Sequence, residues 1–187
     1  MINKASFTYN PFQENTYIVY GEGGECAVID PGFSNSAESG DFFRHIEELG
    51  LTPAAVLLTH AHPDHVCGAS LLQKKYGLPV YMNEADRPLL EYAPEMTRQY
   101  GLPCPEIDFK TTAVEDGESV RAAGLEFKVI TTPGSRRMLL PPGGGEDALQ
   151  RRYPVRWNHR PQRPQGRGVR RPHQIDNGEA YLPRPGD

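Results

Sequence analysis

Short apolar runs and amphipathic stretches alternate along the first 134 residues of this 187-residue chain. Apolar runs of four to eight residues indicate strands, whereas an apolar period of 3.6 residues indicates helices. The predicted strands span residues 16–20, 26–29, 54–59, 80–82, 118–122 and 125–131. The predicted helices span residues 36–49, 68–76 and 83–92. Gly50 and Gly77 end the first two helices, and the glycine-rich turn 21–24 joins the first two strands as a hairpin. Hairpins mixed with strand–helix alternation favour an α+β fold.

Four residues with metal-binding side chains follow the third predicted strand within six positions: His60, His62, Asp64 and His65. Imidazole and carboxylate groups are the ligands that zinc and similar divalent ions prefer. His60 and His62 alternate along an extended strand end, so we expect both to lie on the same side. Asp64 and His65 come after the break imposed by Pro63 and can face a second ion nearby. Such a dense group indicates a metal site rather than a polar surface loop.

The order of several segments resembles one known family. Residues 59–65 resemble the T-H-x-H-x-D-H signature of the metallo-β-lactamase superfamily. Residues 10–19, 27–32 and 131–134 resemble that family's opening strands, its strand ending in Asp-Pro-Gly, and the strand end that precedes the next metal-binding histidine. Residues 10–134 together look most like the glyoxalase II-like branch, which hydrolyses thioesters such as S-lactoylglutathione.

The resemblance implies a fold, a site and a chemistry. The fold would be the N-terminal half of a metallo-β-lactamase αβ/βα sandwich. His60 and His62 would bind the first metal ion, and Asp64 and His65 the second, with zinc as the expected metal in one or two positions. Asp64 would also be the catalytic residue that orients the attacking water or shuttles a proton. The expected partner is a small-molecule thioester substrate. Asp30 is expected to be structural, holding the loop near the site.

The resemblance ends at Gly134, where the family continues with a histidine and this chain has Ser135-Arg136-Arg137. Residues 1–134 hold nine Lys and Arg against nineteen Asp and Glu, whereas residues 135–187 hold eleven arginines, no lysine and five acidic residues. A shift by one base, with permitted codons, turns residues 151–162 into Gly-Asp-Thr-Leu-Phe-Gly-Gly-Thr-Ile-Gly-Arg-Ser, which resembles the family's missing bridging-aspartate segment. We therefore expect an incomplete metallo-β-lactamase-like domain over 1–134. The Arg/Pro/Gly-rich tail 135–187 would be out of frame and disordered.

Two alternatives stay open. The chain could be a catalytically dead, truncated or misread member of the family. Whether it is such a member or a hydrolase with an incomplete site, its activity is expected to be low. The Arg-rich tail could instead bind RNA beside a metal-binding domain, although it has little aromatic interleaving. The nucleotide sequence around codon 134 would separate these readings, and salt-dependent retention of RNA would support the second.

Composition also predicts a compartment. The chain has no run of 18 apolar residues and no signal-peptide core near its start, so neither a membrane span nor a membrane partner is expected. Cys26, Cys67 and Cys104 are odd in number and widely spaced. This pattern favours a cytoplasmic protein without a disulfide framework, with Cys67 as a buried thiol. Nucleic acid is not expected as a partner under the leading hypothesis.

Overall fold

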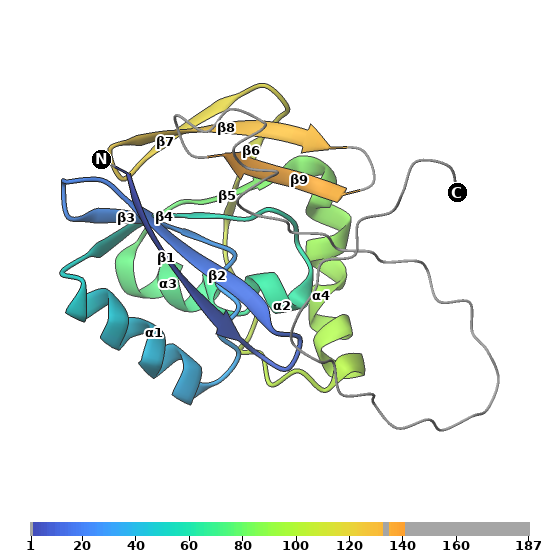
Figure 1. Cartoon of the computed structure of the whole chain (residues 1–187). Helices are drawn as coiled ribbons and strands as arrows, with labels where there is room; N and C mark the ends of the chain where they lie inside the picture. The colour runs from blue at the N-terminus through green and yellow to red at the C-terminus, as the bar shows by residue number, and fades with distance from the viewer. Residues whose placement is uncertain (1, 133–134, 141–187) are drawn as a thin grey trace, which may run out of the picture. The chain divides into compact units, whose positions relative to one another are not determined.

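The computed structural model describes residues 2–132 and 135–140. Its larger sheet has six strands in the order β1-β2-β3-β4-β5-β6 (Figure 1). These strands are β1 (Asn3–Tyr9), β2 (Glu14–Tyr20), β3 (Glu25–Ile29), β4 (Thr52–Leu57), β5 (Val80–Asn83) and β6 (Thr111–Val114). The β1–β2 and β2–β3 pairs are antiparallel, and the pairs from β3 to β6 are parallel. The smaller sheet is antiparallel and contains β7 (Ser119–Ala122), β8 (Leu125–Thr132) and β9 (Ser135–Leu140).

Helices connect the parallel strands of the larger sheet. They are α1 (Ser36–Glu48), α2 (Pro63–Val66), α3 (Ala69–Tyr76), the 3-10 turn η1 (Glu84–Asp86) and α4 (Arg87–Tyr100). Helix α1 begins where the Asn35 side chain accepts a hydrogen bond from the Glu38 N–H, a typical N-cap. Helix α3 ends at Gly77, which adopts a left-handed conformation with φ of 66°. Parallel strands require such crossovers, and these crossovers deliver the loops that form the site.

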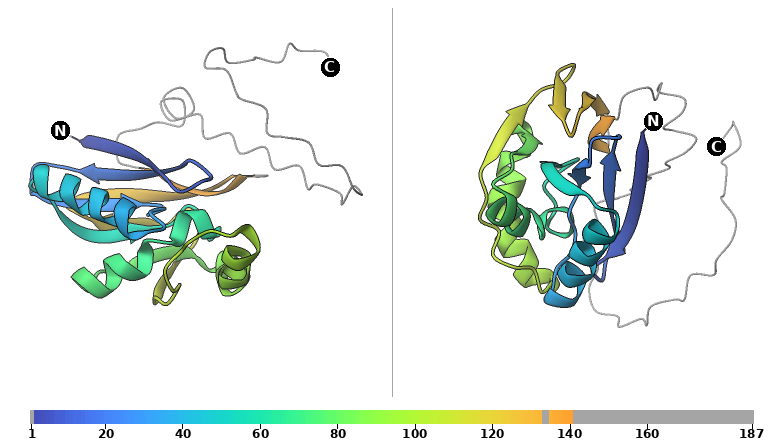
Figure 2. Two further views of the ribbon diagram at one scale, coloured as in Figure 1. Left: turned by 90° about the horizontal axis from the view of Figure 1, so that it is seen from below. Right: turned by 90° about the vertical axis from the view of Figure 1, so that its left-hand side faces the viewer.

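The larger sheet has two apolar faces, as its strand period of two requires. Ile18 and Val28 face a core that also contains Phe42 of α1 and Leu72 of α3. Their neighbours in the strands face a second core, which includes Phe127 of β8. The three-stranded sheet and helices α1 and α3 therefore lie on opposite sides of the larger sheet (Figures 1 and 2). This confirms the expected α+β arrangement, with two sheets packed face to face and helices outside the larger one.

Several elements differ from the predicted ones. The strand predicted over 54–59 starts at Thr52 and ends at Leu57, so His60 and His62 lie in a loop rather than on a strand end, and His65 lies in helix α2. The helix predicted to end near residue 92 continues to Tyr100 through Pro94, because it buries Met96. Strand β9 also pairs with β8 beyond the boundary predicted at residue 134. The predictions for residues 141–187 lie outside the described residues.

The cysteine prediction was wrong. Cys67 and Cys104 form a disulfide with their Cα atoms 5.2 Å apart, and the free Cys26 is buried. Cys67 directly follows helix α2, while Cys104 lies after helix α4, so the fold brings together residues that are 37 positions apart. Counting cysteines cannot reveal this proximity.

The cytoplasmic location stays a prediction. Among the described residues, no helix is both long enough and apolar enough to span a membrane.

Candidate metal centre

The site lies where the adjacent parallel strands β3 and β4 end. Asp30 directly follows β3, and Thr59 comes two residues after the end of β4. Because parallel strands end at the same sheet edge, these two residues meet there. Their contact is direct: Asp30 Oδ1 accepts a hydrogen bond from the Thr59 N–H at 2.7 Å, and Asp30 Oδ2 accepts one from the Thr59 hydroxyl at 2.5 Å. Asp30 therefore anchors the start of the histidine loop, as the sequence predicts.

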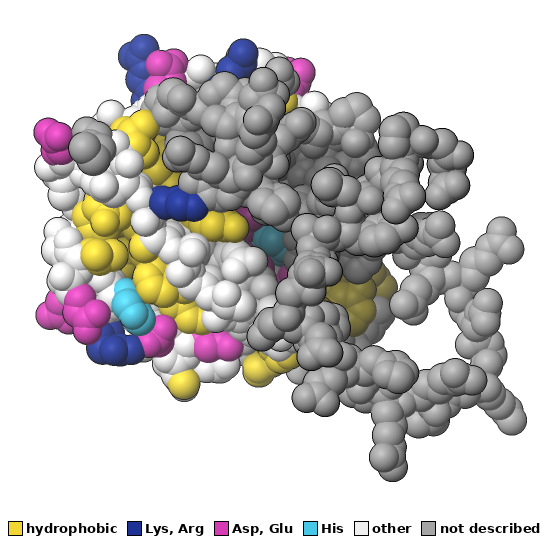
Figure 3. All heavy atoms as spheres, in the orientation of Figure 1, with side chains coloured by type: hydrophobic (Ala, Val, Ile, Leu, Met, Phe, Trp, Pro, Cys, Tyr) yellow, Lys and Arg dark blue, Asp and Glu magenta, His cyan; other side chains and the backbone are white. Residues whose placement is uncertain are grey.

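The predicted site residues lie close together. The ring centroid of His60 is 4.7 Å from that of His62 and 4.0 Å from that of His65. The Asp64 carboxylate joins them, with Oδ2 3.4 Å from His65 Nε2. His65 is buried, whereas His60, His62 and Asp64 are partly exposed. In Figure 3 a histidine side chain is visible with acidic side chains beside it. His60 thus lies beside both other histidines, and Asp64 lies beside His65.

Asp30 is a second partner of these histidines. Its Oδ2 lies 3.1 Å from His65 Nδ1, and one ligand-type atom each of Asp30, His60 and His65 lies within 4.8 Å of the others. Both Asp30 oxygens already accept hydrogen bonds from Thr59, and the Thr59 hydroxyl lies 2.9 Å from His60 Nδ1. Carboxylates placed in this way orient metal-binding imidazoles through the nitrogen that faces away from the ion. The ligand-type atoms of Asp30, His60 and His65 are therefore close enough to hold one divalent cation, while Asp30 also accepts hydrogen bonds from Thr59.

The electrostatics of His65 follow from this arrangement. Burial alone disfavours the charged imidazole, but the charge and hydrogen bond of Asp30, and the charge of Asp64, act in the opposite direction. The net result is a pKa of His65 raised above the usual 6.5. The surroundings of this ring are therefore negative, which favours any cation placed beside it.

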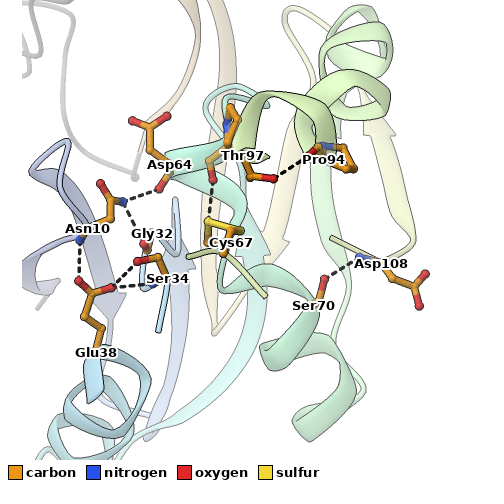
Figure 4. The surroundings of a disulfide bond; sticks show 12 residues. Asn10, Gly32, Ser34, Glu38, Asp64, Cys67, Ser70, Pro94, Thr97 and Asp108 are labelled. Carbon is orange, nitrogen blue, oxygen red and sulfur yellow. Dashed lines mark hydrogen bonds between the residues drawn. A yellow bond between two sulfur atoms is a disulfide. The ribbon is translucent and has the colours of Figure 1, made fainter. Parts of the chain in front are cut away.

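Helix α2 carries Asp64 and His65, and polar contacts fix it from outside. Asn10 donates from Nδ2 to the Gly32 carbonyl at 2.9 Å and to the Asp64 carbonyl at 3.0 Å (Figure 4). Asn10 adopts a left-handed conformation with φ of 54°, which asparagine tolerates better than most residues. The Gly68 N–H adds a hydrogen bond to the Pro31 carbonyl at 2.7 Å. The loops after β1 and β3 thus fix both ends of the helix.

A second buried carboxyl group, that of Glu14, lies behind this site. Its side chain is fully buried, and its Oε1 lies 3.8 Å from His65 Nδ1. Burial raises the pKa of Glu14 well above its usual 4.5, and the negative charges of Asp30 and Asp64 act in the same direction, while the hydrogen bond from Thr16 opposes them. Sequence analysis missed Glu14, Asn10 and Thr59 as parts of the site. The Asp-Pro-Gly sequence was the signal that indicated a role for Asp30 near the site. No comparable sequence signal marks Glu14.

The chain belongs to the metallo-β-lactamase superfamily, whose sequence pattern matches residues 9–142. Similar structures agree: the B3 metallo-β-lactamase BLEG-1 superposes with a TM-score of 0.62 at 27% identity, over 73% of this chain and 66% of that one. TTHA1623 in a di-iron-bound form also gives 0.62, at 36% identity over 75% and 68% of the two chains. The family and fold class predicted from the sequence are confirmed.

Within the superfamily, the chain resembles hydroxyacylglutathione hydrolases. It is 33% identical to the hydroxyacylglutathione hydrolase GloC of Haemophilus influenzae over 129 residues, which is 66% of this chain and 57% of that protein. It is 34% identical to the hydroxyacylglutathione hydrolase of an Enterobacter species over 66% of this chain and 40% of that protein. The predicted glyoxalase II-like branch is thus confirmed. The match spans about half the length of these two relatives.

Proposed function

We propose that this chain is a zinc-dependent hydrolase that acts on small-molecule thioesters of the hydroxyacylglutathione type. The observation that carries the proposal is the set of contacts around His60 and His65. The His60 ring centroid lies 4.0 Å from that of His65 and 4.7 Å from that of His62, and Asp64 Oδ2 lies 3.4 Å from His65 Nε2. Two relatives named as hydroxyacylglutathione hydrolases support the substrate class. We keep the predicted division of ligands, with His60 and His62 at one ion and Asp64 and His65 at the other.

Each residue of the site would have a separate role in the proposed hydrolysis. A bound zinc ion supplies Lewis acidity and makes water more acidic. His60 and His62 would present neutral nitrogen ligands from the loop, while Asp30 keeps the Nδ1 side of His65 occupied and leaves Nε2 facing the site. Asp64 is partly exposed, so its carboxylate could accept a proton from water and return it to the departing thiolate.

Activity of the 187-residue chain itself is expected to be low, because no segment of residues 135–187 matches the family's later ligand motifs. Losing the outer partners of metal ligands commonly costs 10–100-fold in affinity or activity, and losing ligands should cost more. The dead-member alternative differs in degree: such a chain would bind one ion weakly through the four residues and would show little hydrolysis. The RNA-binding alternative rests on residues outside the described part.

The experiment measures metal binding and S-lactoylglutathione hydrolysis together. Binding of Co²⁺ followed by its visible spectrum should fall at least tenfold in affinity for His60→Ala and for His62→Ala. His45→Ala is the matched control, because His45 lies on α1 against Asp41 and Phe7, away from the other histidines. Equal Co²⁺ affinity in all four proteins would contradict the metal site. Metal binding without any thioester hydrolysis, even in a frame-corrected chain, would contradict the substrate class.

A further inference from the structure

Glu14 is an acidic side chain at a position where the strand pattern places core residues. It begins β2, where the alternate residues Glu14, Thr16 and Ile18 are buried, while Asn15 between the first two is exposed. The residue is 1% exposed, and its neighbour on the same face, Ile18, is 0% exposed. An apolar side chain would fill this position without the desolvation penalty that a carboxyl group incurs. The carboxyl group must therefore be compensated by something it contacts.

One oxygen of Glu14 joins a hydrogen-bonded chain that leads to the site. Oε2 lies 3.0 Å from the Thr16 hydroxyl, which is also 2.8 Å from the Asp30 carbonyl oxygen. The same hydroxyl accepts a hydrogen bond from the Gly32 N–H at 2.9 Å. Through the Thr16 hydroxyl, Glu14 is thus linked to Asp30 and to Gly32, which belong to the same turn.

The other oxygen faces a proposed metal ligand. Oε1 lies 3.8 Å from His65 Nδ1 and makes no hydrogen bond with any described residue. The neighbouring turn is shaped around the carboxyl group: a Cβ atom on Gly32 would overlap Oε2 and lie 2.6 Å from the Asp64 carbonyl oxygen. The glycine therefore leaves space for the carboxyl group between the turn and α2.

We infer that Glu14 is a positioning residue for His65. Its Oε2 holds the Thr16–Asp30–Gly32 turn in place, and its Oε1 faces Nδ1 of His65 beside the closer Asp30. Together the two carboxyl groups fix the ring so that Nε2 points toward Asp64 and the metal position. Glu14 contacts neither substrate nor ion in this role, and it acts only through His65. The part of the inference that concerns metal affinity rests on the proposed function.

The test uses three variants of the whole chain. Glu14→Leu keeps the volume but removes the polar contacts, Glu14→Gln keeps the contact with Thr16, and Glu25→Gln removes an exposed carboxylate from the neighbouring strand as a matched control. Long-range proton–nitrogen NMR of the metal-free proteins reports which His65 nitrogen carries the proton, at a pH where that ring is neutral. Competition with a chelator reports Co²⁺ affinity.

Wild type, Glu14→Gln and Glu25→Gln should show a single His65 tautomer protonated at Nδ1, and Glu14→Leu should show a mixture. Co²⁺ affinity should fall about 10–100-fold in Glu14→Leu, as for other partners of metal ligands, and less in Glu14→Gln. If Glu14→Leu fails to fold, Thr16→Val removes the hydroxyl that links Glu14 to Asp30 and Gly32 and should give the same mixture.

The two proposals fail in different ways. If wild type binds no Co²⁺, the proposed function fails, while the tautomer measurement still decides the role of Glu14. A single Nδ1-protonated tautomer in a folded Glu14→Leu or Thr16→Val protein would overturn the positioning role, and so would Co²⁺ affinity equal to that of a metal-binding wild type. A purely structural role would lower the unfolding midpoint without changing the tautomer.

Discussion

Loss of the Cys67–Cys104 disulfide should destabilise the domain by an amount that its loop length sets. The bridge closes a loop with a sequence separation of 37. The chain-entropy relation for a loop of that length gives about 13 cal/mol/K, or about 4 kcal/mol at 25 °C. Cys104 is the better position for a substitution, because it is partly exposed, whereas Cys67 is fully buried and a serine hydroxyl there would lack solvent. Cys104→Ser should therefore lower the free energy of unfolding by about 2–5 kcal/mol.

Urea unfolding followed by circular dichroism, with and without a reducing agent, measures this effect. Reduction should lower the wild-type midpoint and leave Cys104→Ser unchanged, since that variant has no bridge to lose. Thiol titration of the denatured, unreduced wild type should find only the free Cys26. Three titratable thiols, or a wild-type unfolding midpoint that does not change on reduction, would refute the disulfide. Either result would support the prediction from the cysteine count that all three cysteines are reduced.

Two further predictions concern the core. Gly68→Ala should destabilise the fold by about 1–3 kcal/mol through overpacking, because the new Cβ would overlap the buried Phe33 ring. Gly40→Ala on helix α1 meets no atom within 4 Å and should instead stabilise it by about 0.5–1 kcal/mol in the same urea assay, so equal losses in both would contradict the packing argument. Burial, then the charge of Glu25, raises the pKa of Cys26 to about 12, so alkylation at mildly alkaline pH should require unfolding. The raised pKa adds stability below the usual value of 9.0, and this contribution should fade as the pH rises toward 12.

The sequence could predict the site where the chemistry is local. His60 to His65 follow a buried apolar strand within six positions, and the His60 ring lies 4.7 Å from that of His62 and 4.0 Å from that of His65. The layers were predictable for a similar reason, since alternate residues of β2 to β4 face the two cores. The detailed position was less accurate, because β4 ends at Leu57 and the histidines depend on the loop that follows.

Long-range partners could not be predicted in this way. Asp30 and Thr59 are 29 residues apart, and the Cys67–Cys104 pair is separated by 37, so no local period encodes either contact. The helix predicted over 83–92 ends eight residues earlier than α4, which runs to Tyr100 and contains Pro94. In the structure the burial of Met96 extends it, which is a tertiary effect that overrides local propensity.

The acidic surroundings of the histidines link the fold to the proposed chemistry. Glu14, Asp30 and Asp64 come from three separate segments, and all three carboxyl groups lie within 4 Å of a ring nitrogen of His65. In a domain that had only to fold, such a group of buried or half-buried acids would be unfavourable, because like charges repel and burial disfavours each of them. A divalent cation beside the imidazoles would compensate that repulsion. Thr16 and Thr59 bond the carboxyl groups of Glu14 and Asp30, and Asn10 bonds the Asp64 main chain. The arrangement is therefore better explained by binding of a cation than by stability alone.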